Sequence, residues 1–252
     1  MPASLFASFP SRRAAALAFS LLAAGGCSQR PPSSCVVQVS DPAERVNRGV
    51  FAFNRTLDDY VLAPVARGYT ALPGFVQAGV HNFAANFGEP KVFINDVLQG
   101  NGERSLTTLT RFIFNTTLGV AGLVDVSGRM GLERHESDFG QTFGVWNIAD
   151  GPIVELPLLG SHNTRDALGQ ALSFAVDPLG SSDTVEAMGT AATVGGVVDG
   201  RAEALPLTDA LRQLPDYYQA LRDAQAQRRV ERVAEGKAGA AGTLQCSEER
   251  QP

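Results

Sequence analysis

The chain of 252 residues carries a formal net charge of −5, with 44% hydrophobic and 19% charged residues. This length allows one large domain or two small ones, and the low share of charged residues leaves room for a sizeable apolar core. The negative balance argues against nucleic-acid binding, which depends on Lys and Arg neutralising phosphates, and against docking on anionic lipid by charge alone.

The first 26 residues resemble an export signal. Arg12 and Arg13 precede the apolar stretch Ala14–Ala24, which is too short to span a bilayer as a helix. Small residues then lead to Cys27, and this arrangement resembles a bacterial lipoprotein signal in which the cysteine is acylated and becomes the first residue. Ser28 after it resembles lipoproteins sorted to the outer membrane. An ordinary secretory signal and a plain N-terminal helix are the alternatives.

Two further cysteines, Cys35 and Cys246, stand near the two ends of the mature chain. In an oxidising periplasm they could form a disulfide, and two free thiols are the alternative. Residues 27–40 contain a Pro/Ser-rich stretch and are expected to be a tether, whereas residues 235–252 have the composition of a disordered tail.

The segment between tether and tail begins with amphipathic helical patterns. Asp41 and Pro42 predict a helix start, with Asp41 as the N-cap. On this helix Asn47 and Asn54 form a polar stripe, for which contact with solvent is the ordinary interpretation. Val76–Phe87 predicts a second helix, which the sequence Gly88-Glu89-Pro90 is expected to end. The apolar face of the first helix consists of Val46, Val50, Phe53, Leu57 and Tyr60.

Two apolar blocks, Val92–Leu98 and Phe112–Val124, flank a polar joint. The second block has no charged residue, yet it contains Asn115, Thr116 and several other small or polar residues. As a helix it would reach roughly 20 Å, which is less than the roughly 30 Å hydrocarbon core of a bilayer. The block therefore cannot span a membrane. It can sit in a protein core, or it can lie in one leaflet with its polar residues turned away from the lipid tails.

The stretch Arg129–Asp138 is charged, and a helix would bring His135 and Asp138 to one face. Without further His or Cys at ligand spacing, a solvated charge run is favoured over a metal half-site. Trp146 then precedes the turn signal Ala149-Asp150-Gly151-Pro152, and the strand pattern Ile153–Leu156 follows. This order predicts a short hairpin or an apolar loop.

The last third predicts three helices separated by an unpatterned segment. The first begins at Asn163–Asp166 and runs through Phe174, and the second covers Thr208–Leu214. Asp216 is expected to cap the third, Tyr217 to about Ala234. Residues 180–200 are rich in Gly, Ala and Thr and have no clear periodicity. The chain as a whole predicts a mostly α fold.

Motifs of the common enzyme classes are missing from the sequence. It has no nucleophile elbow, no P-loop, no zinc-ligand cluster and no H-E-x-x-H. Gly100-Asn101-Gly102 lacks the third glycine and the preceding strand of a dinucleotide loop, and nothing places an acid beside His135 and Ser137. These features disfavour an enzyme, and no cofactor or metal site is predicted.

A series of short motifs follows in order along most of the chain. The motifs are Asp41-Pro42, Asn47-Arg48, Phe53-Asn54, Asn82-Phe83, Glu89-Pro90, Asn95, Leu98-Gln99-Gly100, Thr110-Arg111-Phe112, Asn115-Thr116, Leu118-Gly119, Gly122, Asp125-Val126, Phe139-Gly140, Gly151-Pro152, Leu156-Pro157, Gly160-Ser161, Arg165-Asp166, Asp216-Tyr217-Tyr218 and Gln227-Arg228. This series is similar to the MlaA (VacJ) family of outer-membrane lipoproteins. The similarity covers Asp41 to about Pro178 in good register and resumes loosely near Asp216, whereas residues 180–200 and the pair Cys35/Cys246 depart from the family pattern.

The resemblance implies a fold and a function. Residues 41–234 would form a ring of short amphipathic helices with a small hairpin or loop, embedded in the inner leaflet of the outer membrane beside trimeric porins. Phospholipid that has strayed into the outer leaflet would pass through a polar central channel. A soluble periplasmic lipid carrier, serving an ABC-type transport system, would then receive it. This traffic would maintain the lipid asymmetry of the outer membrane.

Moving a head group through hydrocarbon is costly, so a path needs polar side chains within an apolar body. Asn47, Asn54, Asn115 and Thr116 are the candidates for lining such a path, and helix capping or bonding to the backbone is the alternative for each. The family's hairpin loop near the channel resembles the turn here, which makes its residues gating candidates. A structural lipoprotein that scaffolds porins or envelope complexes without moving lipid is the alternative function. The gating candidates are Trp146, Asp150, Gly151 and Pro152.

Overall fold

The computed structural model describes residue 37 and residues 39–239, except 177 and 181. The chain divides into two units, Met1–Cys35 and Val36–Pro252, and every described residue belongs to the second. The predicted signal, the lipidation residue Cys27 and the two cysteines Cys35 and Cys246 therefore lie outside the described residues.

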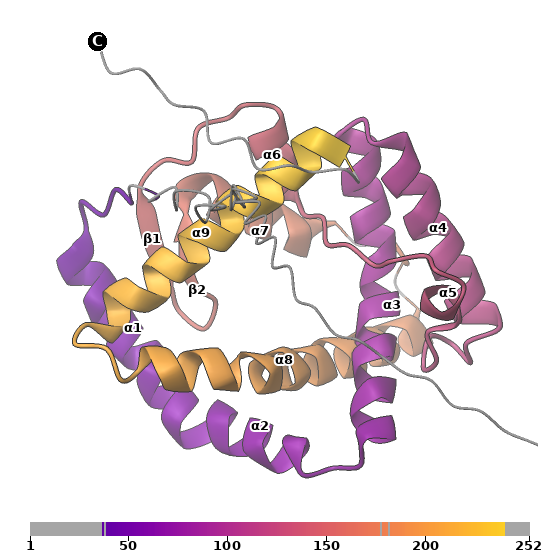
Figure 1. Ribbon diagram of the computed structural model, residues 1–252, viewed down its shortest axis with the longest axis horizontal. Coiled ribbons are helices and arrows are strands. Elements are labelled where there is room, and N and C mark those ends of the chain that lie inside the picture. Colours follow the sequence, from indigo (N-terminus) through magenta and orange to yellow (C-terminus); the bar gives the residue numbers. More distant parts are fainter. Residues whose placement is uncertain (1–36, 38, 177, 181, 240–252) are drawn as a thin grey trace, which may run out of the picture. The chain divides into compact units, whose positions relative to one another are not determined.

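Within the second unit the described chain is mostly helical, as predicted, with one small antiparallel sheet (Figure 1). The short segment Asp58–Leu62 is a π-helix that joins α1 to α2 without a break. The other elements are α1 Glu44–Leu57, α2 Ala63–Thr70, α3 Gly74–Leu98, α4 Gly102–Thr117, α5 Val126–Arg129, α6 Phe139–Val145, β1 Ile153–Leu156, β2 Gly160–Asn163, α7 Thr164–Ala175, α8 Asp183–Leu211 and α9 Tyr217–Ala238.

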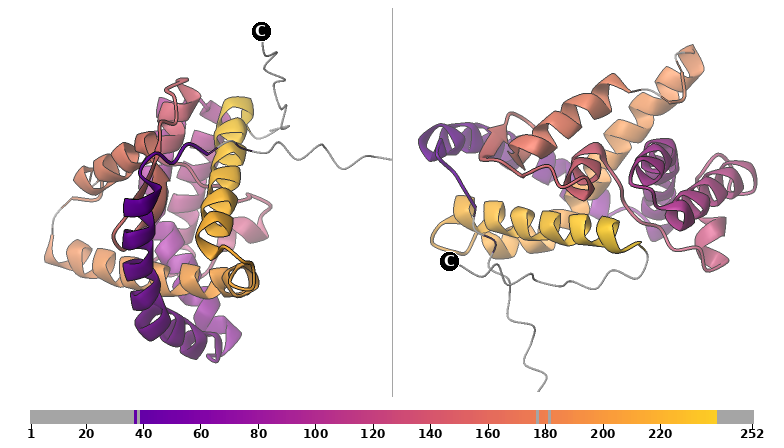
Figure 2. Two further views of the ribbon diagram at one scale, coloured as in Figure 1. Left: turned by 90° about the vertical axis from the view of Figure 1, so that its left-hand side faces the viewer. Right: turned by 90° about the horizontal axis from the view of Figure 1, so that it is seen from above.

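The elements of this unit contact one another in a closed circuit. α2 and α3 both pack on α8, and α3 also contacts α6. From α6 the circuit continues through α9 to β2, and β1 packs on α1, which leads back to α2. Figure 1 shows this ring of elements face on, and Figure 2 shows α7 and α9 on opposite sides of α6. Among the described residues, no helix has both the length and the apolar character that crossing a membrane requires.

Two helices are longer than predicted because proline does not end them. α3 continues through Pro90 to Leu98, so the expected end at Gly88–Pro90 was wrong. α8 begins at Asp183, within the unpatterned segment 180–200, and continues through Pro206 to Leu211. It therefore includes most of Thr208–Leu214, which was predicted as a separate short helix. α3 packs on both α4 and α8, and α8 also packs on α2 and α9. This tertiary packing outweighs the backbone hydrogen bond that each proline removes.

The apolar block Phe112–Val124 is not one helix. α4 ends at Thr117, and the chain then turns with Val120 (φ 54°), Ala121 (φ 54°) and Gly122 (φ 91°) in left-handed conformations. A Cβ atom at Gly122 would lie 2.6 Å from the side chain of Asn86 on α3. The block is therefore split by a tight turn that returns against α3, and glycine is required at its closest approach.

The predicted hairpin is confirmed. Ile153 pairs with Asn163 and Leu156 with Gly160 in an antiparallel register, so the strands are joined by residues 157–159. The turn signal at Ala149–Pro152 leads into β1 and does not join the strands.

Helix caps were predicted with mixed success. The side chains of Asn163 and Asp216 accept hydrogen bonds from backbone N–H groups at the starts of α7 and α9, as expected. α9 continues past the expected end through Ala238. At α1 the prediction was wrong, because the N-cap is Ala43 and makes no side-chain bond. Asp41 instead accepts hydrogen bonds from side chains on α1 and α9.

Candidate functional site

The burial pattern of this unit is reversed relative to that of a water-soluble domain. Among the described residues, buried polar and charged side chains outnumber buried hydrophobic ones. Many large hydrophobic side chains are exposed, including Tyr60 at 81% and Phe75 at 79%. Exposed apolar surface on this scale marks contact with a membrane or a partner protein. The main apolar cluster is small and lies between α2 and α8, where it consists of Ala63, Ala66, Tyr69, Ala202 and Leu205.

Helix α4 shows the reversal most clearly. Its exposed stripe is apolar and contains Leu106, Leu109 and Ile113 at helical spacing. Its buried face is polar throughout and turns toward α3 and α5, the two helices that α4 contacts most. In water the opposite arrangement would be expected, since an amphipathic helix buries its apolar stripe. The buried residues of α4 are Arg104, Ser105, Thr108, Arg111 and Asn115.

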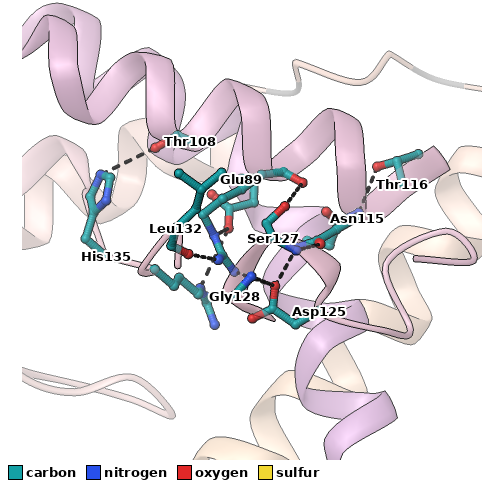
Figure 3. Close-up of polar contacts among 12 residues, drawn as sticks. Glu89, Thr108, Asn115, Thr116, Asp125, Ser127, Gly128, Leu132 and His135 are labelled. Carbon is teal, nitrogen blue, oxygen red and sulfur yellow. Dashed lines mark hydrogen bonds and ion pairs between the residues drawn. The ribbon is translucent and has the colours of Figure 1, made fainter. Parts of the chain in front are cut away.

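A buried polar cluster around Arg111 ties α4 to α3 and to the loop after α5. Figure 3 shows Glu89, Asp125 and Leu132 of this cluster. Arg111 Nε donates to Glu89 Oε1 at 3.3 Å, and Nη2 donates to Asp125 Oδ1 at 3.2 Å. Nη1 donates to the carbonyl of Leu132. Burial raises the pKa of Glu89, and the nearby guanidinium groups of Arg111 and Arg134 partly oppose that rise.

Two predicted channel residues lie at the edge of this cluster. Asn115 is buried, donates from Nδ2 to Asp125 Oδ1 at 3.0 Å, and accepts from the backbone N–H of Ser127 at 3.0 Å. Thr116 is exposed, and its hydroxyl accepts from Asn86 Nδ2 at 2.9 Å. Both side chains thus hold the turn after α4 against α3 and α5.

The charged stretch before α6 is only partly the solvated run that was predicted: Arg129, Glu133, Arg134 and Glu136 are exposed, whereas His135 and Asp138 have partners within the fold. His135 Nε2 lies 2.8 Å from Asp96 Oδ2, and Asp96 is fully buried. Asp138 pairs with Arg229 on α9. The reason lies in α3: its continuation beyond Pro90 carries Asp96 into the interior, where a buried carboxylate needs a partner.

The other two channel candidates, Asn47 and Asn54, fasten the hairpin to α1. Asn47 donates to the carbonyl of Ile153 at 3.1 Å and accepts from the N–H of Glu155 at 3.1 Å. Asn54 donates to Glu155 Oε1 and to the carbonyl of Leu156, and it accepts from the N–H of Leu158 at 2.8 Å. The ordinary interpretation of these two as a solvated stripe was therefore wrong. In both residues the side-chain Nδ2 donates and the side-chain Oδ1 accepts a hydrogen bond.

The gating candidates are spread over two places. Trp146 is half exposed, and its Nε1–H donates to the carbonyl of Leu98 at 3.0 Å. Asp150 pairs with Arg165 at the start of α7. Gly151 has φ +69°, and the carbonyl of Pro152 accepts from the N–H of Thr164 at 3.0 Å. The segment 150–152 is thus attached to the N-terminus of α7, ahead of the hairpin.

Two cavities flank α9. The first, of about 340 Å³, lies against the hairpin, the segment before β1 and the start of α7, and the second, of about 260 Å³, lies against α1, α8 and the hairpin turn. Asn54 lines the second cavity, whereas Asp150 and Gly151 line the first. The other predicted site residues line neither: these are Asn47, Asn115, Thr116, Trp146 and Pro152.

Arginines are the functional-site residues that the sequence reasoning missed. Those facing the second cavity come from α1, from α8 and the residue that follows it, and from α9, so their convergence depends on the tertiary fold. On α9, positions 222, 225, 228, 229 and 232 recur at helical spacing and all face the first cavity, which is a signal that the sequence did contain. The arginines are Arg55, Arg201, Arg212, Arg222, Arg228, Arg229 and Arg232.

One further group has the ligand types of a metal site. His81 Nδ1 lies 2.8 Å from Asp199 Oδ2 and 3.3 Å from Glu203 Oε1. The hydroxyl of Tyr69 donates to the other oxygen of Asp199 at 2.8 Å. These polar contacts link the group internally, and the three residues are also close enough to hold a cation.

Comparison with known proteins assigns the family. The profile of the family described as "MlaA lipoprotein" matches residues 39–232. An uncharacterised protein of Rickettsia felis is 40% identical over 152 residues, which are 60% of this chain and 60% of that protein. The match thus spans less than two thirds of the length of that relative. The Escherichia coli protein named "Intermembrane phospholipid transport system lipoprotein MlaA" is 36% identical over 196 residues, 75% of this chain and 76% of that protein.

A solved structure supports the same assignment. Work described as "Structural basis for maintenance of bacterial outer membrane lipid asymmetry" contains a chain that superposes with a TM-score of 0.66 at 36% sequence identity. The superposition covers 75% of this chain and 97% of the other. The family profile covers almost the whole described unit, and the related fold agrees with it. This chain belongs to the MlaA lipoprotein family.

Proposed function

We propose that this protein removes misplaced phospholipid from the outer leaflet of the outer membrane and delivers it toward the periplasm. The observation that supports it most is the reversed burial, with apolar side chains outside and charged or amide side chains inside. A body of this kind is stable against lipid tails and offers head groups a polar interior. The family membership and the name of the E. coli relative agree with this proposal.

The unit would sit in the periplasmic leaflet. The exposed apolar stripe on α4 and the exposed side chains of α7, Leu168 and Phe174, would contact acyl chains. Lipidation of Cys27 would add a second means of attachment, since two acyl chains suffice for stable anchoring. Residues 27–40 would serve as the tether to the membrane-seated unit.

The lipid path would follow the cavities beside α9. Asn54 lines the second cavity and Asp150 and Gly151 line the first, which supports lining by Asn54 and gating by Asp150 and Gly151. Lining by Asn47, Asn115 and Thr116 stays a prediction, as does gating by Trp146 and Pro152. Partners would be a trimeric porin beside the exposed apolar faces and a soluble periplasmic lipid carrier of an ABC-type system.

The test uses the native host with and without this gene. Phospholipid in the outer leaflet is measured by labelling intact cells with a membrane-impermeant amine reagent. Loss of the gene should raise labelled phosphatidylethanolamine, and expression of the full chain should restore it. Unchanged labelling in the deletion strain would contradict transport. If porin recovery from the membrane fell while labelling stayed constant, the protein would be a scaffold and the transport proposal would fail.

A further inference from the structure

The two cavities beside α9 share a short border. Leu159 at the hairpin turn and Gln225 and Arg228 on α9 line both of them. Gln225 and Arg228 are three positions apart on α9, so their side chains emerge on the same face of the helix. Anything that moves from one cavity to the other along α9 therefore passes these two polar groups.

Arg228 differs from the other cavity-lining arginines in its charge balance. Arg201 pairs with Asp58, and Arg229 pairs with Asp138 and Asp166. Arg228 is exposed, and across the described part of the chain it makes no ion pair or hydrogen bond. The remaining lining arginines are paired as well: Arg55 with Asp59, Arg212 with Asp58 and Asp59, Arg222 with Asp41 and Asp223, and Arg232 with Glu136.

The neighbouring amide is also unsatisfied. Gln225 Oε1 is buried and, within the described residues, has no hydrogen-bond partner. Buried polar atoms in native proteins are almost always bonded, and each exception asks for an explanation. A free guanidinium and an orphan amide thus stand side by side where the cavities meet.

The acidic groups of the second cavity do not compete for Arg228. Asp58 is held by Arg201 and Arg212. Glu155 accepts from Asn54 and from Ser161. Because these carboxylates already have partners, the positive charge of Arg228 remains available to an incoming anion.

We propose that Arg228, with Gln225 beside it, binds the phosphate of a phospholipid head group as the lipid passes between the two cavities. This inference rests on the proposed transport function. A guanidinium presents a planar fork of donors that matches two phosphate oxygens. The exposed side chains of Leu158 and Leu159 at the hairpin turn offer apolar contact to the rest of the lipid. Arg228 would therefore contact the substrate directly.

The experiment measures binding of short-chain lipids to the purified full chain in detergent by calorimetry. The probe is dihexanoyl phosphatidylglycerol, and dihexanoylglycerol and inorganic phosphate are the comparison ligands. Arg228→Gln should weaken phosphatidylglycerol binding by about 10- to 100-fold, the range expected for a charge-assisted hydrogen bond. Arg228→Lys keeps the positive charge but lacks the planar fork of donors, so its affinity for phosphatidylglycerol should lie between those of wild type and Arg228→Gln. Arg45→Gln is the matched control, because Arg45 is exposed and lines neither cavity.

The outcomes separate this inference from the transport proposal. Wild-type binding of phosphatidylglycerol that falls in Arg228→Gln and persists in Arg45→Gln supports the inference. Equal binding by Arg228→Gln, or equal wild-type binding of dihexanoylglycerol, would overturn it while leaving transport intact. Binding of inorganic phosphate alone would overturn the lipid assignment. If wild type bound no lipid and did not clear outer-leaflet phospholipid in cells, the transport proposal itself would fail. Circular dichroism should show unchanged unfolding of Arg228→Gln, since no described partner is lost.

Discussion

Replacing Arg111 by Met tests whether the buried polar cluster between α3, α4 and α5 holds the fold together. The substitution keeps an unbranched stem as long as that of Arg111 up to Nε, and it removes all three hydrogen bonds of the guanidinium, to Glu89, Asp125 and Leu132. Glu89, whose side chain is 2% exposed, then keeps only the more distant Arg134 at 3.9 Å.

The magnitude follows from the cost of an unpaired buried charge. Removing one partner of a buried ion pair costs about 3–5 kcal/mol. Arg134 remains nearby on Glu89, so we expect a loss near the lower end, about 3 kcal/mol in the free energy of unfolding. The double variant Glu89→Leu with Arg111→Met should recover much of this loss, because no charge is then left unpaired.

The same variant should show a defined pH dependence. Burial raises the pKa of Glu89 above its ordinary 4.5, and removal of Arg111 takes away a group that opposes the rise. A carboxyl with a raised folded pKa contributes stability that is present below the unfolded pKa and is lost as pH rises through the folded value. Arg111→Met should therefore lose more stability at pH 8 than at pH 5, relative to wild type.

The assay is chemical unfolding in detergent, followed by circular dichroism, at both pH values. Arg129→Met is the matched control: Arg129 is on α5, exposed, and without an ion pair in the described chain, so a change within about 0.5 kcal/mol is expected. Equal stability of Arg111→Met and Arg129→Met, or a larger loss at pH 5 than at pH 8, would refute the reasoning.

Three further predictions concern the hairpin, the turn after α4 and the anchor. Asn54→Leu leaves the N–H of Leu158 and a carboxylate oxygen of Glu155 without a partner, so unfolding should become easier by about 1–3 kcal/mol; unchanged stability would mean that the hairpin is held elsewhere. Gly122→Ala should cost more than about 1 kcal/mol, because its φ is +91° and its Cβ would meet Asn86; a neutral effect would show that the turn is differently built. Cys27→Ala should shift part of the protein from the membrane to the soluble periplasmic fraction, because one of two means of attachment is lost while the exposed apolar faces remain; unchanged fractionation would argue against anchoring by lipidation.

The local structure that the sequence predicted best was set by neighbouring residues. The starts of α7 and α9 follow from Asn163 and Asp216, whose side chains bond to backbone N–H groups three residues on. The strand Ile153–Leu156 was also predicted from neighbouring residues, since the turn residues Asp150–Pro152 come directly before it. What failed depended on distant packing. Pro90 and Pro206 lie inside helices that pack on other helices, α3 on α4 and α8, and α8 on α2 and α9. Asp41 accepts hydrogen bonds from side chains of α1 and α9 instead of capping α1.

The candidate site was predictable only in part, for the same physical reason. Asn54 could be singled out because a polar position recurring on an amphipathic helix is visible in sequence; it lines the second cavity, and its role in a lipid path stays a prediction. The residues that line this cavity with Asn54 include residues of α8 and α9, which are far along the chain. An arginine on a helix is ordinarily interpreted as a solvated side chain, and only the tertiary fold shows which residues surround it. The reversal on α4 was equally hidden: periodicity separates Leu106 and Ile113 from Arg111 but does not say which face is outside.

The most direct test of the account is to ask what surrounds the exposed apolar stripe of α4. Cys35 and Cys246 are replaced, Cys27 is retained and acylated, and a spin label is attached at position 113 in place of Ile113. The labelled protein is then reconstituted in bilayers. Power saturation should show high accessibility to oxygen and low accessibility to a water-soluble nickel chelate, while a label at Arg129 should show less of this contrast. Free access of the chelate to position 113 would contradict a unit seated among lipid tails, and with it the proposed path for phospholipid.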